Sequence, residues 1–231
     1  MKNNSKFRKL KNSRVLKVMF SRKSVVFCMA ILVIMILAAI LAPVVTPYDP
    51  YKQDLTNMLQ GSSLQHVFGT DAMGRDVLTR IIYGGRVSFV VGMVSVLIAG
   101  GLGMAIGLLA GMSGGIVDTV LMRIMDAMMS IPMIILALFL GSILGKGLFN
   151  ICLAIGISMI PSYARVTRGQ VLTVKQMDYI TAGQLCGASK FKNTLVHILP
   201  NCISSNIVLM TMNLGNAILN EAALSFLGMG I

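Results

Sequence analysis

The chain has 231 residues, of which 55% are hydrophobic and only 12% are charged, and its mean hydropathy is +0.80. This composition excludes an ordinary soluble globular protein and is typical of a polytopic membrane protein. The formal net charge of +12 could suggest nucleic-acid binding, but nine of the twenty Lys and Arg residues lie at positions 2–23, directly before an apolar run. Such a basic cluster is a topology signal, so we expect no nucleic-acid partner.

Residues 25–42 form an uncharged, almost wholly apolar run. As a helix it is roughly 27 Å long, close to the thickness of the hydrocarbon core, and we interpret it as the first transmembrane helix. A secretory signal peptide is the alternative, but its apolar region is usually about 7 to 15 residues long and further spans follow here. Those spans are predicted at residues 88–110, 116–140, 148–164 and 200–219. The sequence therefore predicts an all-α polytopic membrane protein with about five spans.

The distribution of basic residues predicts the orientation of these spans. With the basic segment 1–24 in the cytoplasm, alternation places the loop 43–87 outside and the loop 165–199 inside. The inner loop belongs to the core at residues 88–231 and contains several basic residues that fit the positive-inside rule, namely Arg165, Arg168, Lys175, Lys190 and Lys192. We expect a multi-pass protein with a cytoplasmic amino terminus.

The sequence offers no metal or nucleotide site. The four cysteines at positions 28, 152, 186 and 202 lack the paired spacing of a metal site or redox pair. No P-loop pattern occurs, because Gly145-Lys146-Gly147 lacks both the upstream glycine and the hydroxyl residue. We therefore expect no metal and no cofactor on this chain, and any ATP chemistry must come from a partner.

Small and charged residues in the second and third spans suggest helix contacts. Gly103, Gly107 and Gly111 recur at four-residue spacing, which favours close helix packing, although glycine is also simply frequent in membrane helices. In the third span, Arg123 and Asp126 are spaced to form an ion pair, with a gate or path lining as the alternative role. Pro132 is expected to kink or locally open this helix.

The last predicted span carries a stripe of amides. At about 100° per residue the amides fall within an arc of roughly 80° on one side of the helix. Lipid is a poor neighbour for amides, so this side faces either another helix or a water-filled path. The stripe consists of Asn206, Asn213, Asn216 and Asn220, with Glu221 near its expected outer end.

An intramembrane serine protease is a distant alternative function. Gly111-Met112-Ser113-Gly114 resembles the nucleophile motif of rhomboid proteases, and a nucleophilic serine needs a base. The chain has two histidines. His66 is expected in the outer loop and His197 in the basic inner loop, whereas Ser113 lies in a turn between spans, and a Gly-Ser-Gly turn is ordinary loop chemistry.

The segment DYITAGQLCGASKFKNTLVHILPN resembles the cytoplasmic coupling loop of bacterial ABC-importer permeases. That motif reads Glu-Ala-Ala, three residues, Gly, nine residues, Ile, any residue, Leu-Pro, and the spacing here is the same. Thr181, Gly183 and His197 stand where the motif has Glu, the second Ala and Ile. The corresponding positions in this chain are Thr181, Ala182, Gly183, Gly187, Ala188, His197, Leu199 and Pro200.

Other segments extend the resemblance over essentially the whole chain. HVFGTDAMGRDVLTRIIYGGRVSFVVG, GGIVDTVLMRIMDAMMSIP, PSYARVTRGQVLTVKQMDYITAG and EAALSFLGMG are similar to blocks of the permeases that import oligopeptides, dipeptides and nickel. The resemblance implies a non-enzymatic subunit in a bacterial inner membrane that forms the translocation path for peptides or nickel complexes. It implies as partners a second permease, two ATP-binding subunits that hold ATP and Mg²⁺, and an extracytoplasmic substrate-binding protein.

In that family the coupling loop docks on the ATP-binding subunit. Gly187 is expected to break a helix between residues 170–185 and 189–196, which gives a short surface helix suited to a cleft. Permeases of the family continue with one more membrane helix after the block that ends this chain. We therefore expect the family's last helix to be lacking, and a truncated, non-transporting fragment that still binds the ATPase is the alternative function.

Overall fold

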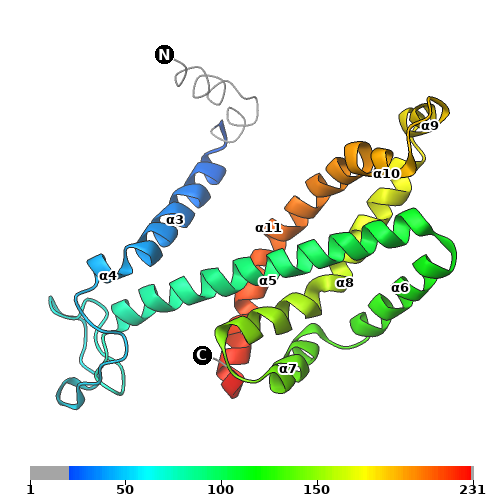
Figure 1. Ribbon diagram of the computed structural model, residues 1–231. Coiled ribbons are helices and arrows are strands. Elements are labelled where there is room, and N and C mark those ends of the chain that lie inside the picture. The colour runs from blue at the N-terminus through cyan, green and yellow to red at the C-terminus, as the bar shows by residue number, and fades with distance from the viewer. Residues whose placement is uncertain (1–20, 230–231) are drawn as a thin grey trace. The chain divides into compact units, whose positions relative to one another are not determined.

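The structure is a computed structural model that describes residues 21–229, and in this range it is helical without a regular strand (Figure 1). It confirms the all-α membrane architecture. The basic segment expected at residues 1–24 lies mostly outside the described residues. Contacts divide the chain into two compact units, residues 1–87 and 88–231.

Among the described residues, the main helix of the first unit is the apolar helix α3 (Lys23–Ile40), which agrees with the predicted first span. Its side chains are largely exposed and only Ala39 is buried, as expected for a helix surrounded by lipid. The short helix α4 (Ala42–Val45) follows directly, with Pro43 in its first turn, where a missing backbone N–H disrupts no helical hydrogen bond.

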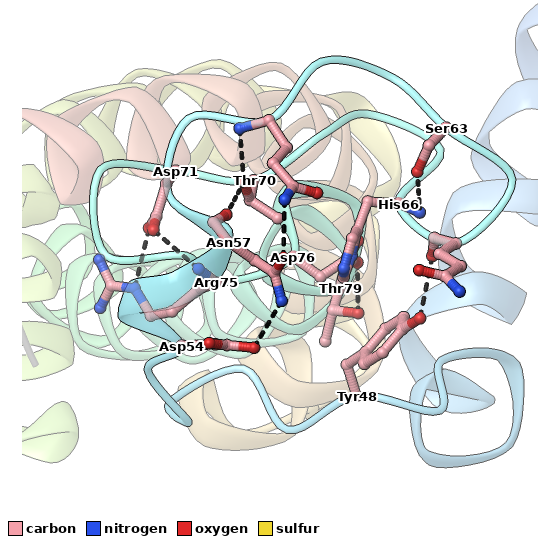
Figure 2. Close-up of polar contacts among 12 residues, drawn as sticks. Tyr48, Asp54, Asn57, Ser63, His66, Thr70, Asp71, Arg75, Asp76 and Thr79 are labelled. Atoms are coloured by element: carbon pink, nitrogen blue, oxygen red, sulfur yellow. Dashed lines mark hydrogen bonds and ion pairs between the residues drawn. The ribbon is translucent and has the colours of Figure 1, made fainter.

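Residues 46–76, here called the first loop, contain the short 3₁₀ helix η1 (Leu55–Asn57) and are held by polar side chains (Figure 2). Asp54 accepts hydrogen bonds from the backbone N–H of Thr56 and the amide of Asn57 at 3.1 and 2.7 Å. Asp71 accepts from the guanidinium of Arg75 at 2.8 Å. At Gly74, φ is +70° and a β-carbon would lie 1.7 Å from the carbonyl oxygen of Asp54, so this turn requires glycine.

Asp76 joins the first loop to the start of α5 (Val77–Ser113). Its carboxylate accepts hydrogen bonds from the backbone N–H and the hydroxyl of Thr79 at 2.8 and 2.6 Å. The Nδ1 atom of His66 lies 3.0 Å from the same carboxylate, and the His66 ring lies beside that of Tyr48 (Figure 2). Asp76 thus caps the first turn of α5 by accepting from the free N–H of Thr79, and α5 begins well before the predicted residue 88.

The longer helices of the second unit are the remainder of α5, α6 (Gly115–Met129), α7 (Met133–Leu144), α8 (Leu148–Lys175) and α11 (Leu199–Leu224). Helix α8 packs against α6, α7 and α11 (Figure 1). It contains more buried residues than any other helix of the unit. Four helices of the described chain are long and apolar enough to cross a membrane, and a fifth span results if α6 and α7 count together.

The predicted third span at residues 116–140 is wrong as a single helix. Helices α6 and α7 are bent by 94° relative to each other, with residues 130–132 outside both. The expected kink at Pro132 is therefore a complete break. Pro132 has no backbone N–H to continue the ladder of α6, and its ψ of 131° is extended, so it precedes a new helix instead.

The helices after the fourth span also differ from the prediction. Helix α8 continues to Lys175 instead of ending near residue 164, and α9 (Asp178–Leu185) starts after an extended Met177. The predicted helix at residues 170–185 is thus interrupted at residues 176–177. Helix α10 (Lys190–Asn193) and the π-helical turn η2 (Thr194–Ile198) lead into α11, and a π-helical turn η3 (Ser225–Met229) follows it.

Candidate functional site

Residues 176–198, here called the second loop, contain most of the segment that resembles a coupling loop, and Leu199 and Pro200 of that segment begin α11. Helix α9 ends at Leu185, and Gly187 follows two residues later with a φ of +88°. The N–H of Ala188 donates to the carbonyl of Gly183 at 2.9 Å, and the N–H of Gly187 donates to that of Gln184 at 3.0 Å. These two bonds are the Schellman pattern, which favours glycine at the left-handed position. Three residues of the predicted motif therefore form one helix end.

Two buried isoleucines anchor the second loop. Ile180 of α9 and Ile198 of η2 are each 1% exposed, and they pack in one cluster with Val171, Val174 and Cys202 of α8 and α11. Asn193 is buried beneath α9 and donates to the carbonyl of Ile180 at 3.5 Å. The second loop is consequently fixed to α8, which precedes it, and to α11, which follows it.

Small residues of the motif allow this close packing. A β-carbon on Gly183 would lie 3.3 Å from the Oδ1 atom of Asn193, so the glycine fits tightly against the buried amide. Ala188 and Leu199 are also partly buried. The remaining motif residues are exposed, namely Thr181, Ala182, Gly187, His197 and Pro200.

Large apolar side chains of the second loop face solvent in this chain. Leu185 is 85% exposed and Phe191 is 72% exposed, and Tyr179 and Val196 are also exposed. The ring of His197 lies edge-on to that of Tyr179, with centroids 6.0 Å apart. A rigid loop end with exposed apolar groups has the properties of a surface that binds another protein.

Ion pairs connect α6 to α8, and sequence spacing did not predict them. Arg168 makes two hydrogen bonds to the carboxylate of Asp118 at 2.5 and 2.6 Å, and Arg165 lies 2.7 Å from Asp126. The predicted pair of Arg123 and Asp126 is separated by 4.0 Å, and Arg123 is largely exposed. Asp126 therefore has its shorter contact with α8. Residue spacing along one helix cannot predict a partner on another helix, so the sequence did not indicate this pair.

The glycine stripe of α5 lies directly against α8. A β-carbon on Gly103 would be 2.5 Å from the β-carbon of Tyr163. At Gly107 it would be 2.4 Å from the carbonyl oxygen of Ala164, and at Gly111 it would be 2.7 Å from a methyl group of Val171. Larger residues at these positions would push the helices apart.

The asparagine stripe of α11 runs from a buried to an exposed position. Asn206 is buried and bonded to Thr167 at 2.9 Å, so it belongs to a helix interface. Asn213 and Asn220 are partly buried, and Asn216 is exposed. Glu221 is buried beside Ser88 of α5, whose hydroxyl donates to it at 3.0 Å. The four amides thus share one side of the helix but have different surroundings.

The serine and the two histidines considered for a protease form no described hydrogen bond or ring contact with one another. His66 bonds to Asp76 in the first loop, and His197 lies beside Tyr179 in the second. Neither of these contacts involves Ser113, which is the last residue of α5. The described geometry gives no serine and base pair on which a hydrolytic mechanism could be built.

Comparison with known families gives two matches that agree with the sequence resemblance. Residues 103–231, more than half of the chain, match the family described as binding-protein-dependent transport system inner membrane component. Residues 13–61 match the family described as N-terminal TM domain of oligopeptide transport permease C.

Individual relatives align over most of the chain. The dipeptide transport system permease protein DppC of Haemophilus influenzae is 41% identical over 205 residues, which cover 86% of this chain and 70% of the relative. The di/tripeptide permease of Pseudomonas aeruginosa is 41% identical over 87% of this chain and 68% of its own length. The glutathione transport permease GsiD of Escherichia coli is 40% identical over 91% of this chain and 70% of its own length. The chain therefore belongs to the binding-protein-dependent transport permeases and is a membrane subunit of an ABC importer.

Proposed function

We propose that this chain forms part of the translocation path of a peptide importer and that its second loop docks on an ATP-binding subunit. The observation that carries the proposal is the second loop itself. Ile180 and Ile198 fix it to α8 and α11, while Leu185 and Phe191 remain exposed. A docked partner that moves can thus displace both helices, because buried side chains of the loop pack against them.

Nucleotide-driven movement of the ATP-binding subunits would then change the path. Subunits that close on ATP bind one arrangement of the permease more tightly and so favour it, and hydrolysis returns the other arrangement. The chain supplies no ATP chemistry in this scheme. Its partners are a second permease, two ATP-binding subunits with ATP and Mg²⁺, and an extracytoplasmic binding protein.

Leu185→Asp tests the docking surface. Because Leu185 is 85% exposed, the substitution should leave insertion and folding intact, yet it places a charge in an apolar contact and should reduce co-purification of the ATP-binding subunits about tenfold or more. Leu64→Asp is the matched control, since Leu64 is a fully exposed leucine of the first loop. Undiminished co-purification with Leu185→Asp would contradict the docking surface.

Uptake by a strain that lacks its own peptide permease tests the substrate. The named relatives described above transport dipeptides, di/tripeptides and glutathione, so we expect this chain, with its partner subunits, to restore uptake of a labelled dipeptide. Uptake of nickel instead would support the second substrate class that the sequence suggested. Binding of the ATPase without any uptake would support the non-transporting alternative.

The orientation can be tested with the chain's own thiols. Cys186 is exposed in the second loop, whereas Cys152 and Cys202 are buried in helices. If the amino terminus and the second loop are cytoplasmic, a membrane-impermeant maleimide should label Cys186 in inverted vesicles and not in intact cells. Labelling that persists in Cys186→Ser would come from another thiol, and labelling of Cys186 in intact cells would reverse the orientation.

A further inference from the structure

Arg123, Asp126 and Arg165 form a charged group on α6 and α8, here called the arginine cluster. The guanidinium of Arg165 donates to the carboxylate of Asp126 at 2.7 Å, and that of Arg123 lies 4.0 Å from the same carboxylate. Among residues 21–229, neither arginine lies within 4.0 Å of another carboxylate. One carboxylate therefore faces two guanidinium groups, and one positive charge of the cluster remains uncompensated.

The neighbouring pair of Arg168 and Asp118 shows how the same two helices hold charges that only join them. Its two hydrogen bonds of 2.5 and 2.6 Å match one guanidinium to one carboxylate, and its side chains are 33% and 15% exposed. The side chains of Arg123 and Arg165 are 80% and 53% exposed. Because arginine has five N–H donors, the arginine cluster still offers donors to a further anion.

The arginine cluster lies within membrane-spanning helices. Helix α8 is long and apolar enough to cross a membrane, and α6 meets the same test together with α7. At 1.5 Å per residue, Arg123 is about 12 Å beyond the start of α6, and the exposed side chains of Val120 and Ile124 are next to it in the sequence of this helix. Charges at such a depth are costly in lipid and usually face a protein interior or a water-filled cavity.

The break between α6 and α7 lies close to the arginine cluster. Residues 130–132 begin four positions after Asp126, belong to neither helix and are exposed in this chain. Irregular backbone at membrane depth is tolerated where other protein covers it or where it lines water, and interrupted helices commonly surround the substrate sites of transporters. Exposed charges and exposed irregular backbone thus occur on one stretch of the chain, and together they favour a water-filled path.

We propose that the arginine cluster binds the carboxylate of a peptide substrate in the translocation path. This inference rests on the proposed function and names the chemical group that the path would recognise. Arginine is well suited to a carboxylate, because its planar N–H groups match the two oxygens. Arg123 would supply these donors, since its contact with Asp126 is long, and Arg165 would remain bonded to Asp126. A lipid phosphate has similar chemistry, and the experiment below separates the two anions.

Modification by phenylglyoxal, which reacts with accessible guanidinium groups, tests the site in the complete importer. The importer is held in nanodiscs of neutral lipid without its binding protein, and mass spectrometry measures the modification of each arginine. A dipeptide at about four times its dissociation constant should slow the modification of Arg123 about fivefold. The C-terminal amide of the same dipeptide should not slow it. Arg22 is an exposed control outside the cluster and should react equally in every sample.

Substitutions at Arg123 test whether the site serves transport. In vesicles with all partner subunits, Arg123→Gln should lower the dipeptide taken up per ATP hydrolysed about tenfold, the change that loss of one hydrogen bond to a charged group gives. Arg123→Lys keeps the charge and should restore most of the uptake. Because Arg123 is 80% exposed, both variants should fold. Lys146→Gln removes an exposed charge between α7 and α8 and should leave uptake unchanged.

Several outcomes would overturn the inference. Protection of Arg123 by both peptides alike or by neither would do so, and so would uptake per ATP that is unchanged in Arg123→Gln or equally low in Arg123→Lys. Slower modification of Arg123 in nanodiscs that contain anionic lipid, without any effect of the dipeptide, would assign the cluster to lipid phosphates instead. A wild-type importer that takes up no dipeptide contradicts the proposed substrate, whereas an active wild type with unprotected Arg123 contradicts this site alone.

Discussion

The first and second loops are held in opposite ways. In the first loop, carboxylates accept hydrogen bonds from nearby backbone and side-chain donors, as Asp54, Asp71 and Asp76 do. In the second loop, the fold depends on Ile180, Ile198 and one buried amide, and large apolar side chains remain exposed. Both loops expose large apolar side chains, such as Leu64 in the first and Leu185 in the second, so the contrast lies in the groups that hold each loop and not in the exposed surface.

This difference indicates which loop depends on its own hydrogen bonds for its shape and which is expected to bind a partner. Local hydrogen bonds and glycine turns specify a loop shape without help, because each donor and its acceptor are close in sequence. Exposed leucine and phenylalanine occur in both loops, but in the second loop they lie within the segment that resembles the coupling loop, and there we expect an interface. Changes to the carboxylates of the first loop should therefore alter its own fold, and changes to the exposed apolar residues of the second should alter binding.

Gly74→Ala should have the largest effect on folding. The new β-carbon would lie 1.7 Å from the carbonyl oxygen of Asp54, and the φ of +70° disfavours alanine in addition. We expect a loss of about 4 kcal/mol in the stability of the first loop, measured as rapid cleavage by trypsin within residues 46–76. Gly61→Ala is the control, because a β-carbon there has no neighbour within 4 Å. Equal protease resistance in both variants would contradict the requirement for glycine.

Ile180→Ala should give the next largest effect, in the second loop. The substitution would enlarge an existing cavity of about 60 Å³ that Ile180 lines with Met112, Asn193 and Ile198, and large-to-small changes of this kind cost about 2 to 3 kcal/mol. Hydrogen exchange of α9 should accelerate accordingly. Leu185→Ala should leave this exchange unchanged, since its side chain is exposed. Faster exchange in Leu185→Ala would mean that the exposed residue also supports the fold.

The spans and the end of α9 could be predicted from the sequence, but the contacts between helices and the break between α6 and α7 could not. Apolar runs and charge placement indicate spans, and the spacing around Gly187 indicates a helix end, because these signals are local. The partners of Asp126 and Asn206 lie 39 residues away on another helix, where no local pattern can show them. The break between α6 and α7 exceeded the expected kink at Pro132, since tertiary packing decides how far a proline bends the chain.

Acidification should loosen the first loop. Burial raises the pKa of the Asp76 carboxyl, but hydrogen bonds from Thr79 and His66 lower it more, so its pKa lies below the ordinary 3.8. The pKa values of Asp54 and Asp71 are lowered as well, chiefly by hydrogen bonds from the side chain of Thr56 and the backbone of Arg75. These groups therefore stabilise the loop above about pH 4, and the stabilisation is lost as the pH falls through the lowered values.

Hydrogen exchange at the amide of Thr79, corrected for the intrinsic effect of pH, would measure this loss between pH 6 and pH 3. Asp76→Asn should make exchange at Thr79 faster at pH 6 and less dependent on pH. The other two carboxylates remain in that variant, so part of the dependence should persist elsewhere in the loop. Protection at Thr79 that is the same at both pH values in the wild type would show that Asp76 stays ionised throughout.

The two histidines of the chain give the smallest contrast, one in each loop. His66→Phe keeps a ring beside Tyr48, whose centroid lies 4.8 Å away, but removes the 3.0 Å contact with Asp76. The other oxygen of Asp76 keeps its bonds to Thr79, so we expect a loss of about 1 kcal/mol, which hydrogen exchange in residues 60–70 would report. His197→Phe should change the stability of the second loop by less than about 0.5 kcal/mol. The position is exposed, and a phenylalanine ring can keep the same edge-on contact with Tyr179. An equal loss in both variants would remove the distinction between a loop held by hydrogen bonds to its carboxylates and one held by buried isoleucines.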